Sequence, residues 1–436
     1  MTKDGIRRVA ARGAFLAALG LGLACHQETI LIAPPADTTH SGGGGGGGGG
    51  TVQHATLTVT LTVATPDTSI AAALGWTTGR VPGAIVSIAP SDYPPDSSVA
   101  VSDAAGMVSF PQLLTRKYTI TVARTITKLE HARLDSADQD VGGLAGALHV
   151  MVDTPGVSVG VPMFAGRRGS LVVSEWWSPA DASTVPNGFY PFAGYVEVYN
   201  NTDTTIYLDG KIFGDAVLQT DGTSQHPCSA VEQYTDDSVG VWAYLVYRFP
   251  GAGHDHPLAP GAAAVLATDA IDHRTVNPDA TDLSHADFEF IGSADVDNPA
   301  VPNMINLVAF DKPGGHGYYP DPVASTPFVA NPVALDTLPI AYPFNNVPFY
   351  RIPRAAVLDV ATFWWPFSTY PRCTYLISPI FDREPGGLIP QSSFPLPSIQ
   401  RKVWGQSAGG HTLLLRTKTT SVDFQNLFPR TPGAVP

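Results

Sequence analysis

Charged side chains are scarce in this sequence, at 14% of 436 residues, and basic ones are scarcer than acidic ones. Lys and Arg number 25 against 38 Asp and Glu, which gives a formal net charge of -13. Binding to nucleic acid needs a basic face that neutralises phosphates, so this balance argues against a nucleic-acid partner. Hydrophobic residues reach 44%, which excludes wholesale disorder, and the 43 Gly and 39 Pro favour turns over long helices.

Familiar catalytic motifs are absent as well. The sequence contains no His-Glu-x-x-His, no Gly-x-Ser-x-Gly, and no Gly-Lys-Ser/Thr after its glycine run at 42–50. Zinc-protease, serine-hydrolase and phosphate-loop chemistry therefore have no signature here. We expect no catalytic residues and no organic cofactor.

Cysteine is the third scarce residue, with only Cys25, Cys228 and Cys373. Cys25 follows a basic stretch and an apolar stretch at 14–24, which is shorter than the about 20 residues of a membrane span and is typical of a signal peptide. Ala24 directly before Cys25 resembles the lipobox of bacterial lipoproteins, in which that cysteine accepts the lipid. We therefore expect an exported chain that is lipidated at Cys25. No acidic retention residue follows, which favours the outer membrane, on its periplasmic or cell-surface face.

The two remaining cysteines leave two alternatives open. Cys228 and Cys373 would pair as a disulfide in an oxidising compartment. Alternatively they are two separate buried thiols, since both lie beside prolines and no spacing rule joins them.

Changes of composition along the chain predict four segments. Residues 1–24 are the expected signal peptide, and 25–51, with the glycine run, are expected to be a lipidated flexible tether. From 55 to 63 apolar and polar residues alternate, which predicts a strand with one buried face. Further short segments of this kind, separated by turns, predict an all-β fold with a sandwich over 52–165 and a larger β domain over 169–428.

The first β domain contains four short motifs. They are Gly-x-x-Val at 83–86, Asp-x-x-Gly at 103–106, Phe-x-x-Leu at 110–113 and Tyr-x-Ile-x-Val at 118–122. Their order resembles the carboxypeptidase-regulatory-like, or prealbumin-like, sandwich. The resemblance implies an Ig-like fold and carries no catalytic residue.

The second β domain carries two further patterns. Glu175 is followed by Val-Glu-Val-Tyr-Asn at 196–200 and Leu-Asp-Gly at 208–210, an order that resembles lamin-tail-type Ig-like domains. A longer pattern spans 170–424 and resembles the bacterial surface lipoproteins catalogued as domain of unknown function DUF4876. It rests on the segments 260–267, 269–273, 282–289, 297–303 and 351–359. These resemblances imply a lamin-tail-like β domain with long loops and a surface address, and no activity.

Two sets of residues are candidate metal ligands. His254 and His256 flank Asp255, and in extended backbone their side chains point to one side, as a bidentate metal site requires. The alternative is a solvated polar loop. A second, oxygen-rich stretch suits calcium, or else is an acidic loop whose Asp and Asn residues cap turns. Its candidate ligands are Asp287, Glu289, Asp295 and Asp297.

Two tryptophan pairs, Trp176-Trp177 and Trp364-Trp365, are candidates for stacking on a ligand. Neighbouring residues of a strand point to opposite faces, so one of each pair could be exposed. The alternative is that both pairs pack in the core.

These features favour a membrane-anchored surface lipoprotein that acts as a binding or interaction module, or as an accessory of an outer-membrane uptake or assembly system. Its expected partners are the membrane, through the lipid, and an outer-membrane β-barrel receptor or other surface protein. The alternatives are a secreted metal-dependent hydrolase that uses His254 and His256, and a structural spacer without a ligand.

Overall fold

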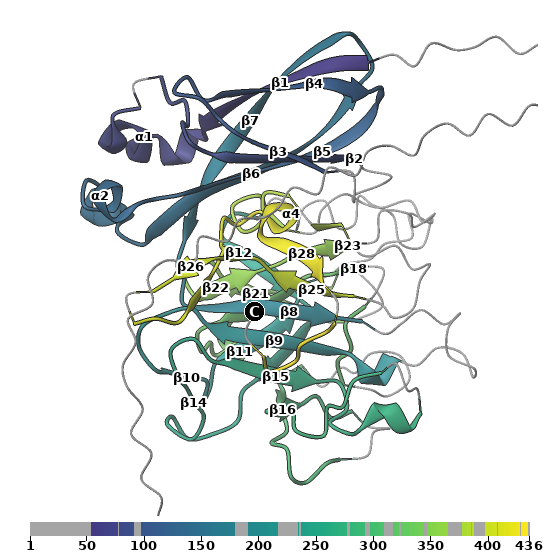
Figure 1. Ribbon diagram of the computed structural model, residues 1–436. Helices are drawn as coiled ribbons and strands as arrows, with labels where there is room; N and C mark the ends of the chain where they lie inside the picture. Colours follow the sequence, from purple (N-terminus) through teal and green to yellow (C-terminus); the bar gives the residue numbers. More distant parts are fainter. Residues whose placement is uncertain are drawn as a thin grey trace, which may run out of the picture. The chain divides into compact units, whose positions relative to one another are not determined.

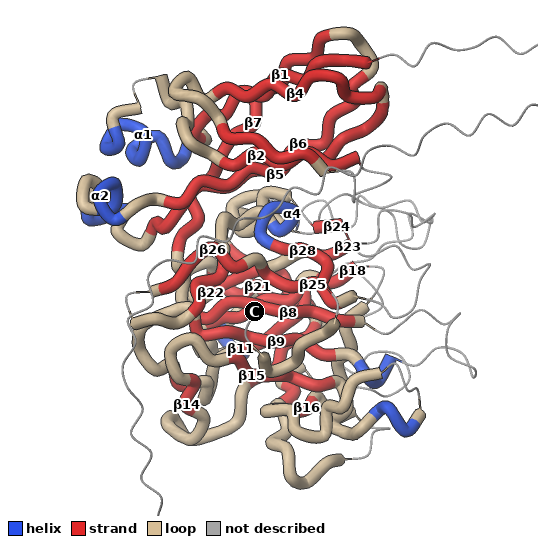
Figure 2. Tube along the Cα trace, in the orientation of Figure 1, coloured by secondary structure: helices blue, strands red, loops and turns tan. Residues whose placement is uncertain are grey.

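Sheets dominate the computed structural model (Figure 2), and the all-β prediction is confirmed. The described residues all lie in one compact unit, Val52–Pro436. They are 54–76, 78–90, 97–178, 191–216, 234, 237–276, 280–292, 297–308, 317–321, 324–342, 347–364, 377–384, 386–387, 397–407, 409–427 and 429–434. None of the helices in these ranges is long and apolar enough to cross a membrane.

The first seven strands form a sheet of their own, in the order β3-β2-β5-β6-β7-β1-β4 (Figure 1). Their bounds are β1 His54–Val63, β2 Ile85–Pro90, β3 Ser98–Val101, β4 Met107–Leu114, β5 Arg116–Thr125, β6 Val141–Val152 and β7 Gly156–Arg167. Along β1 every second side chain is buried, including Leu57, Val59 and Leu61, because successive side chains of a strand point to opposite faces. The long strand β7 pairs in parallel with β1 and then antiparallel with β6, so that the sheet curves around one apolar core.

Short helices close this core. They are η1 Thr65–Asp67, α1 Thr68–Leu74, α2 Lys128–His131 and η2 Ser136–Asp138. Helix α1 buries Ile70 and Leu74 and ends at Gly75, whose φ of 75° suits a residue without a Cβ. Helix α2 begins at Thr127, whose side chain and Glu130 form a capping box.

The strands from β8 onward build two larger sheets that face each other. The first is β16 Phe288–Glu289, β15 Ala263–Ala267, β9 Tyr195–Asn200, β8 Leu171–Trp177, β25 Ser398–Arg401 and β28 Phe424–Leu427. The second is β17 Ile305–Asn306, β13 Leu245–Arg248, β11 Ile212–Asp215, β19 Pro327–Ala330 and β22 Val357–Val360. The two large sheets share one core, which includes Val173, Trp176 and Val196 of the first large sheet and Phe213 and Tyr247 of the second. Side chains of the two inner faces therefore interdigitate as in a sandwich.

Smaller ladders complete this part of the chain. A three-stranded sheet of β12 Gly240–Ala243, β21 Phe349–Pro353 and β20 Ile340–Ala341 packs on the second large sheet through Val241 and Ile352. The other ladders are β18 Ala324–Ser325 with β23 Phe363–Trp364 and β24 Gly386–Gly387, β10 Ile206–Tyr207 with β14 Pro257–Leu258, and β26 Val403–Gln406 with β27 Thr412–Leu414. The remaining helices are η3 Pro191–Ala193, η4 His273–Thr275, η5 Leu335–Thr337 and α4 Thr420–Asp423.

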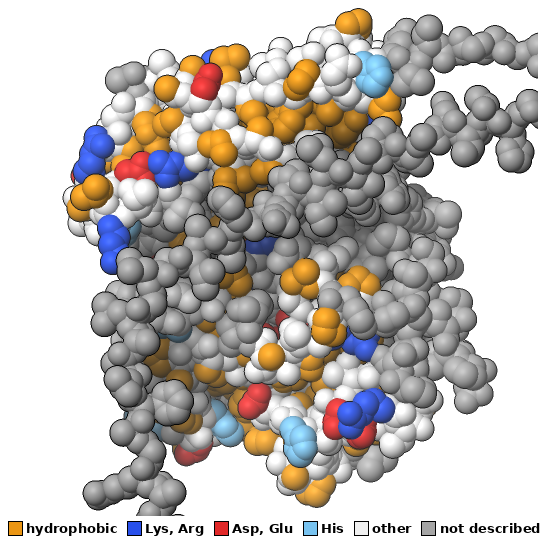
Figure 3. Space-filling model, viewed as in Figure 1, with side chains coloured by type: hydrophobic (Ala, Val, Ile, Leu, Met, Phe, Trp, Pro, Cys, Tyr) orange, Lys and Arg blue, Asp and Glu red, His pale blue; other side chains and the backbone are white. Residues whose placement is uncertain are grey.

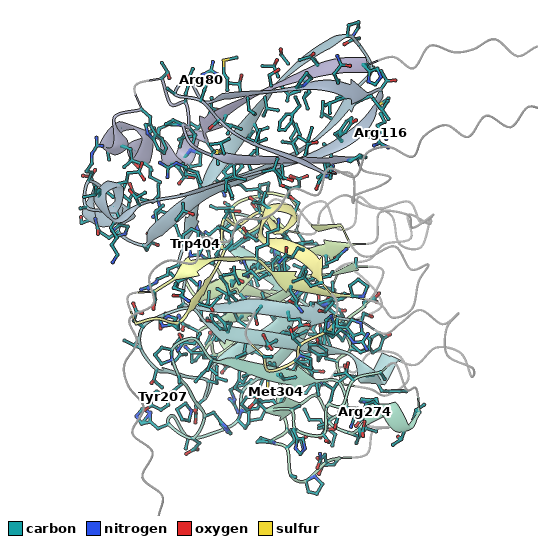
Figure 4. The ribbon with its side chains drawn as sticks, viewed as in Figure 1. Arg80, Arg116, Tyr207, Arg274, Met304 and Trp404 are labelled. Carbon is teal, nitrogen blue, oxygen red and sulfur yellow. The ribbon has the colours of Figure 1, made fainter. Side chains whose placement is uncertain are left out.

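Trp404 of β26, labelled in Figure 4, packs against the seven-stranded sheet of β1 to β7. Its ring lies against Gly142 of β6 and Gly166 of β7, where an added Cβ would come within 2.2 Å and 2.4 Å of it. Glycine is required at both positions because any side chain would occupy the space of the indole.

A buried ion network fixes the end of β25. The guanidinium of Arg401 contacts the carboxylates of Asp359 and Asp423, and Arg416 donates to Asp359 over 2.9 Å. Other basic side chains are few and scattered on the face that Figure 3 shows, as expected from the low content of charged residues.

Candidate functional site

An exposed loop at 251–256, called here the clamped loop, follows Pro250 and leads into β14. Opposite it, the Leu-Asp-Gly motif follows β10, with Leu208 buried in the core and Gly210 in a left-handed turn at φ 73°. Between these two, the side chain of Asp209 points at the backbone of the clamped loop. Its carboxylate accepts N–H groups from Gly253 (3.0 Å), Asp255 (2.9 Å) and His256 (2.9 Å).

The clamp depends on charge and on glycine. Partial burial raises the pKa of Asp209, but the N–H donors of Asp255, His256 and Gly253 outweigh it and lower that pKa to about 2. The carboxylate is therefore ionised at any physiological pH. Gly251, at φ 109°, has no room for a side chain, since a Cβ there would lie 2.1 Å from Oδ1 of Asp209. The side chain of Asp209 thus holds three backbone positions of the loop, and the carboxylate of Asp255 accepts a fourth N–H, that of Ala252 (2.8 Å).

The clamped loop presents an aromatic pair. The ring of His254 lies 4.4 Å from that of Tyr207, which is 40% exposed and is labelled at the edge of the molecule in Figure 4. The ring of His256 instead packs edge-on to Phe288 at 5.0 Å. The two histidine rings therefore have different aromatic partners. Among the described residues, no three His, Cys, Asp or Glu side chains are grouped so that they could hold a metal ion.

The described carboxylates of the oxygen-rich stretch all accept hydrogen bonds from the protein. Asp287 accepts the N–H of Val265, Glu289 accepts those of Ala270 and Asn298, and Asp297 accepts the side-chain amide of Asn303. The partners lie 6 to 22 residues away along the chain, so these carboxylates join separate segments rather than cap their own turns. Asp295 lies outside the described residues, and the calcium site stays a prediction.

The first tryptophan pair corrects the expectation of an exposed ring. Trp176 and Trp177 do point to opposite faces of β8, as the strand geometry predicts, yet they are only 2% and 1% exposed. Trp176 packs on Phe363 in the core of the sandwich. On the other face, the guanidinium of Arg430 lies 4.1 Å above Trp177 and covers it. Both rings are therefore packing residues in this structure.

Of the remaining candidate residues, only Trp364 is described, and it lies in β23. Cys25, Cys228, Cys373 and Trp365 lie outside the described residues, so lipidation and the disulfide stay predictions.

Two glutamates of the lamin-tail-type pattern meet on the outer face of the first large sheet. Glu175 of β8 and Glu197 of β9 are direct cross-strand partners, and both are buried. Glu175 accepts hydrogen bonds from Tyr195 (2.6 Å) and Gln400 (3.1 Å), and Glu197 from Ser174 (2.7 Å) and the N–H of Gly433 (2.8 Å). The segment 430–434 thus crosses β8 and β9 (Figure 1). No pattern in the sequence predicted this pair as a site, although a Glu within an otherwise apolar strand is a visible signal.

The stacked sheets and their internally bonded loops define an all-β protein of the sandwich kind. Residues 259–430 match the family model described as a protein of unknown function, DUF4876, which confirms the resemblance predicted for this region. No curated protein shows significant similarity to the chain.

Solved structures give distant matches. A DUF4876 family protein from Bacteroides thetaiotaomicron shares 18% identity, covers 88% of this chain and 98% of its own, and gives a TM-score of 0.49. A candidate cell adhesion protein from Bacteroides eggerthii shares 6% identity over 71% of this chain and 78% of its own, with a TM-score of 0.17.

Proposed function

We propose that this chain is a membrane-anchored surface protein that binds a protein partner through the clamped loop and Tyr207. The observation that carries the proposal is the clamp itself, in which Asp209 fixes an exposed loop by three backbone hydrogen bonds. Binding loops on a rigid scaffold lose little conformational entropy on association, so a prefixed loop is suited to recognition.

The chemistry of the loop also favours a protein partner. Tyr207 is exposed and is held by its contact with His254, and tyrosine is enriched among the residues that dominate the binding energy of interfaces. The basic N-terminus, the apolar stretch and Cys25 support presentation at a membrane. The separate aromatic contacts of His254 and His256 favour this role over a metal-dependent hydrolase.

Site-specific photo-crosslinking on intact cells tests the proposal. A benzophenone side chain at position 207 should give a discrete adduct, and the same group at Tyr342, which is more exposed at 62%, should not. Asp209→Asn should weaken the adduct at 207, because the loop loses its clamp. No adduct at 207, or equal adducts at both positions, would remove the support for this surface.

A further inference from the structure

A short segment at 429–434, called here the strap, crosses the outer face of the first large sheet. Two of its backbone N–H groups donate to acidic side chains of that sheet, Thr431 to Glu175 (3.2 Å) and Gly433 to Glu197 (2.8 Å). The Oγ1 of Thr431 adds another hydrogen bond to Glu175, also at 3.2 Å. The strap is therefore attached to the sheet through carboxyl groups rather than through a strand ladder.

The strap also covers aromatic side chains. The guanidinium of Arg430 lies 4.1 Å above the ring of Trp177, and its Nε donates to the hydroxyl of Thr281 (3.1 Å). Trp177 and Tyr195 belong to one apolar cluster, in which their ring centres are 6.0 Å apart. Both residues are buried while the strap is in place. Displacement of the strap would therefore expose aromatic surface.

The carboxyl groups that hold the strap, called here the acidic pair, are bonded by neutral donors. Glu175 and Glu197 are cross-strand partners on β8 and β9, and both are buried. Besides the strap, their donors are the hydroxyl groups of Tyr195 and Ser174 and the side-chain amide of Gln400. Neutral donors leave a buried negative charge uncompensated, so two adjacent carboxyl groups held in this way resist the ionisation of both.

The titratable groups around the acidic pair come from each element packed against it. They are Tyr195 and Tyr199 of β9, Asp287 beside β16 and Arg430 of the strap. Arg430, the cation of this set, lies over Trp177. Burial, together with the carboxyl groups of Glu175 and Asp287, raises the pKa of Glu197 to about 8. The closed arrangement therefore favours the neutral form of Glu197, whereas contact with water favours the charged form.

We propose that the strap is a pH-dependent latch, which is closed while Glu197 is protonated and opens when Glu197 ionises and becomes hydrated. The N–H of Gly433 could still donate to an ionised Glu197, but one hydrogen bond does not replace the hydration of a charge. Ionisation therefore favours the open state. Because opening uncovers Trp177 and Tyr195, the latch couples pH to the exposure of an aromatic surface. The latch does not depend on the clamped loop or on its proposed partner.

Linkage between ionisation and opening gives the direction of the effect. In the open state the hydrated carboxyl group of Glu197 has its ordinary pKa of 4.5, whereas burial in the closed state raises that pKa to about 8. The closed state is therefore favoured fully below pH 4.5, and this advantage is lost progressively as the pH rises to about 8. The equilibrium constant for opening should increase up to about tenfold per pH unit over this range and level off above it.

Hydrogen exchange of the full-length chain tests the latch, read by mass spectrometry at the amides of Thr431 and Gly433. After correction for the intrinsic pH dependence of exchange, their protection should fall by up to about a hundredfold between about pH 6 and about pH 8. Glu197→Gln stays neutral and should show strap protection that does not change with pH. Thr431→Val is the matched control, since it removes the hydroxyl bond to Glu175 and should lower strap protection equally at every pH.

Protection that falls with pH at the strap, while the amides of β9 stay more protected, would support the latch. Strap protection that is constant with pH in the wild-type chain would overturn the proposal, and so would an unchanged pH dependence in Glu197→Gln. Equal protection of the strap and of the amides within β9 at each pH would also overturn it, because the strap would then open only when the whole sandwich unfolds.

Discussion

At the scale of single residues, Glu197 shows how this fold keeps a carboxyl group inside a sheet. Burial, together with the neighbouring carboxylates of Glu175 and Asp287, raises its pKa to about 8, against the hydrogen bonds from Ser174 and Gly433. The carboxyl group of Glu197 is therefore mostly protonated near neutral pH, which avoids burying a negative charge in the sheet.

This protonation makes stability depend on pH. Between the unfolded value of 4.5 and about 8, the folded chain binds one proton more than the unfolded chain at Glu197. Its contribution is therefore fully present below pH 4.5 and is lost as the pH rises through 8, with a slope of up to about 1.4 kcal/mol per pH unit. Glu197→Gln, which mimics the neutral acid, should flatten this decline in urea unfolding measured from about pH 5 to about pH 8. An unchanged slope in the variant would show that Glu197 ionises normally in the folded chain.

At the scale of elements, the clamped loop should lose protection when its clamp is weakened. Asp209→Asn removes the charge and one acceptor, so the amides of Gly253, Asp255 and His256 should exchange with solvent faster, at a local cost of about 1 kcal/mol per hydrogen bond. Hydrogen exchange measures this directly. Asp103→Asn is the matched control, since Asp103 binds two backbone amides of its own turn and should leave the clamped loop unaffected. Equal exchange in wild type and Asp209→Asn would mean that the loop is held by other contacts.

The contact between Trp404 and β7 yields a second prediction at this scale. Gly166→Ala places a methyl group in the space of the indole and should destabilise the chain by about 1–3 kcal/mol. Gly160→Ala, in the same strand but with open space around its Cβ, should be neutral or slightly stabilising. Denaturant unfolding of both variants is the measurement. Equal free energies of unfolding would show that the indole of Trp404 does not fill the space beside Gly166.

The sequence was most informative where structure depends on local pattern. Alternation predicted β1, and the strand rule predicted that Trp176 and Trp177 diverge. The burial of Trp177 could not be foreseen, because Arg430 covers it from about 250 residues away in the sequence. The clamp was missed for the same reason: Asp209 and Asp255 are 46 residues apart, and no pattern fixes how β10 pairs with β14. Long-range register, rather than residue type, limited the prediction of the site.

At the scale of the whole molecule, the polar residues of the second β region serve two purposes. Those inside, such as Glu175, Glu197 and Arg401, tie sheets and crossing segments together, and Asp209 at the surface holds a loop in place. A net charge of -13 with few basic side chains disfavours binding to a polyanion. The anchor predicted at Cys25 would place the proposed binding surface at a membrane.

The most direct test of the account combines the anchor with the binding surface. Cells that carry the benzophenone group at position 207 are compared with and without Cys25→Ser, by fractionating membranes and detecting the adduct. We predict that the wild-type chain sediments with membranes and gives the adduct. The Cys25→Ser chain should appear in the soluble exported fraction with the adduct lost or strongly reduced. Membrane sedimentation that is the same for both chains, with an adduct independent of Cys25, would contradict an anchored binding module.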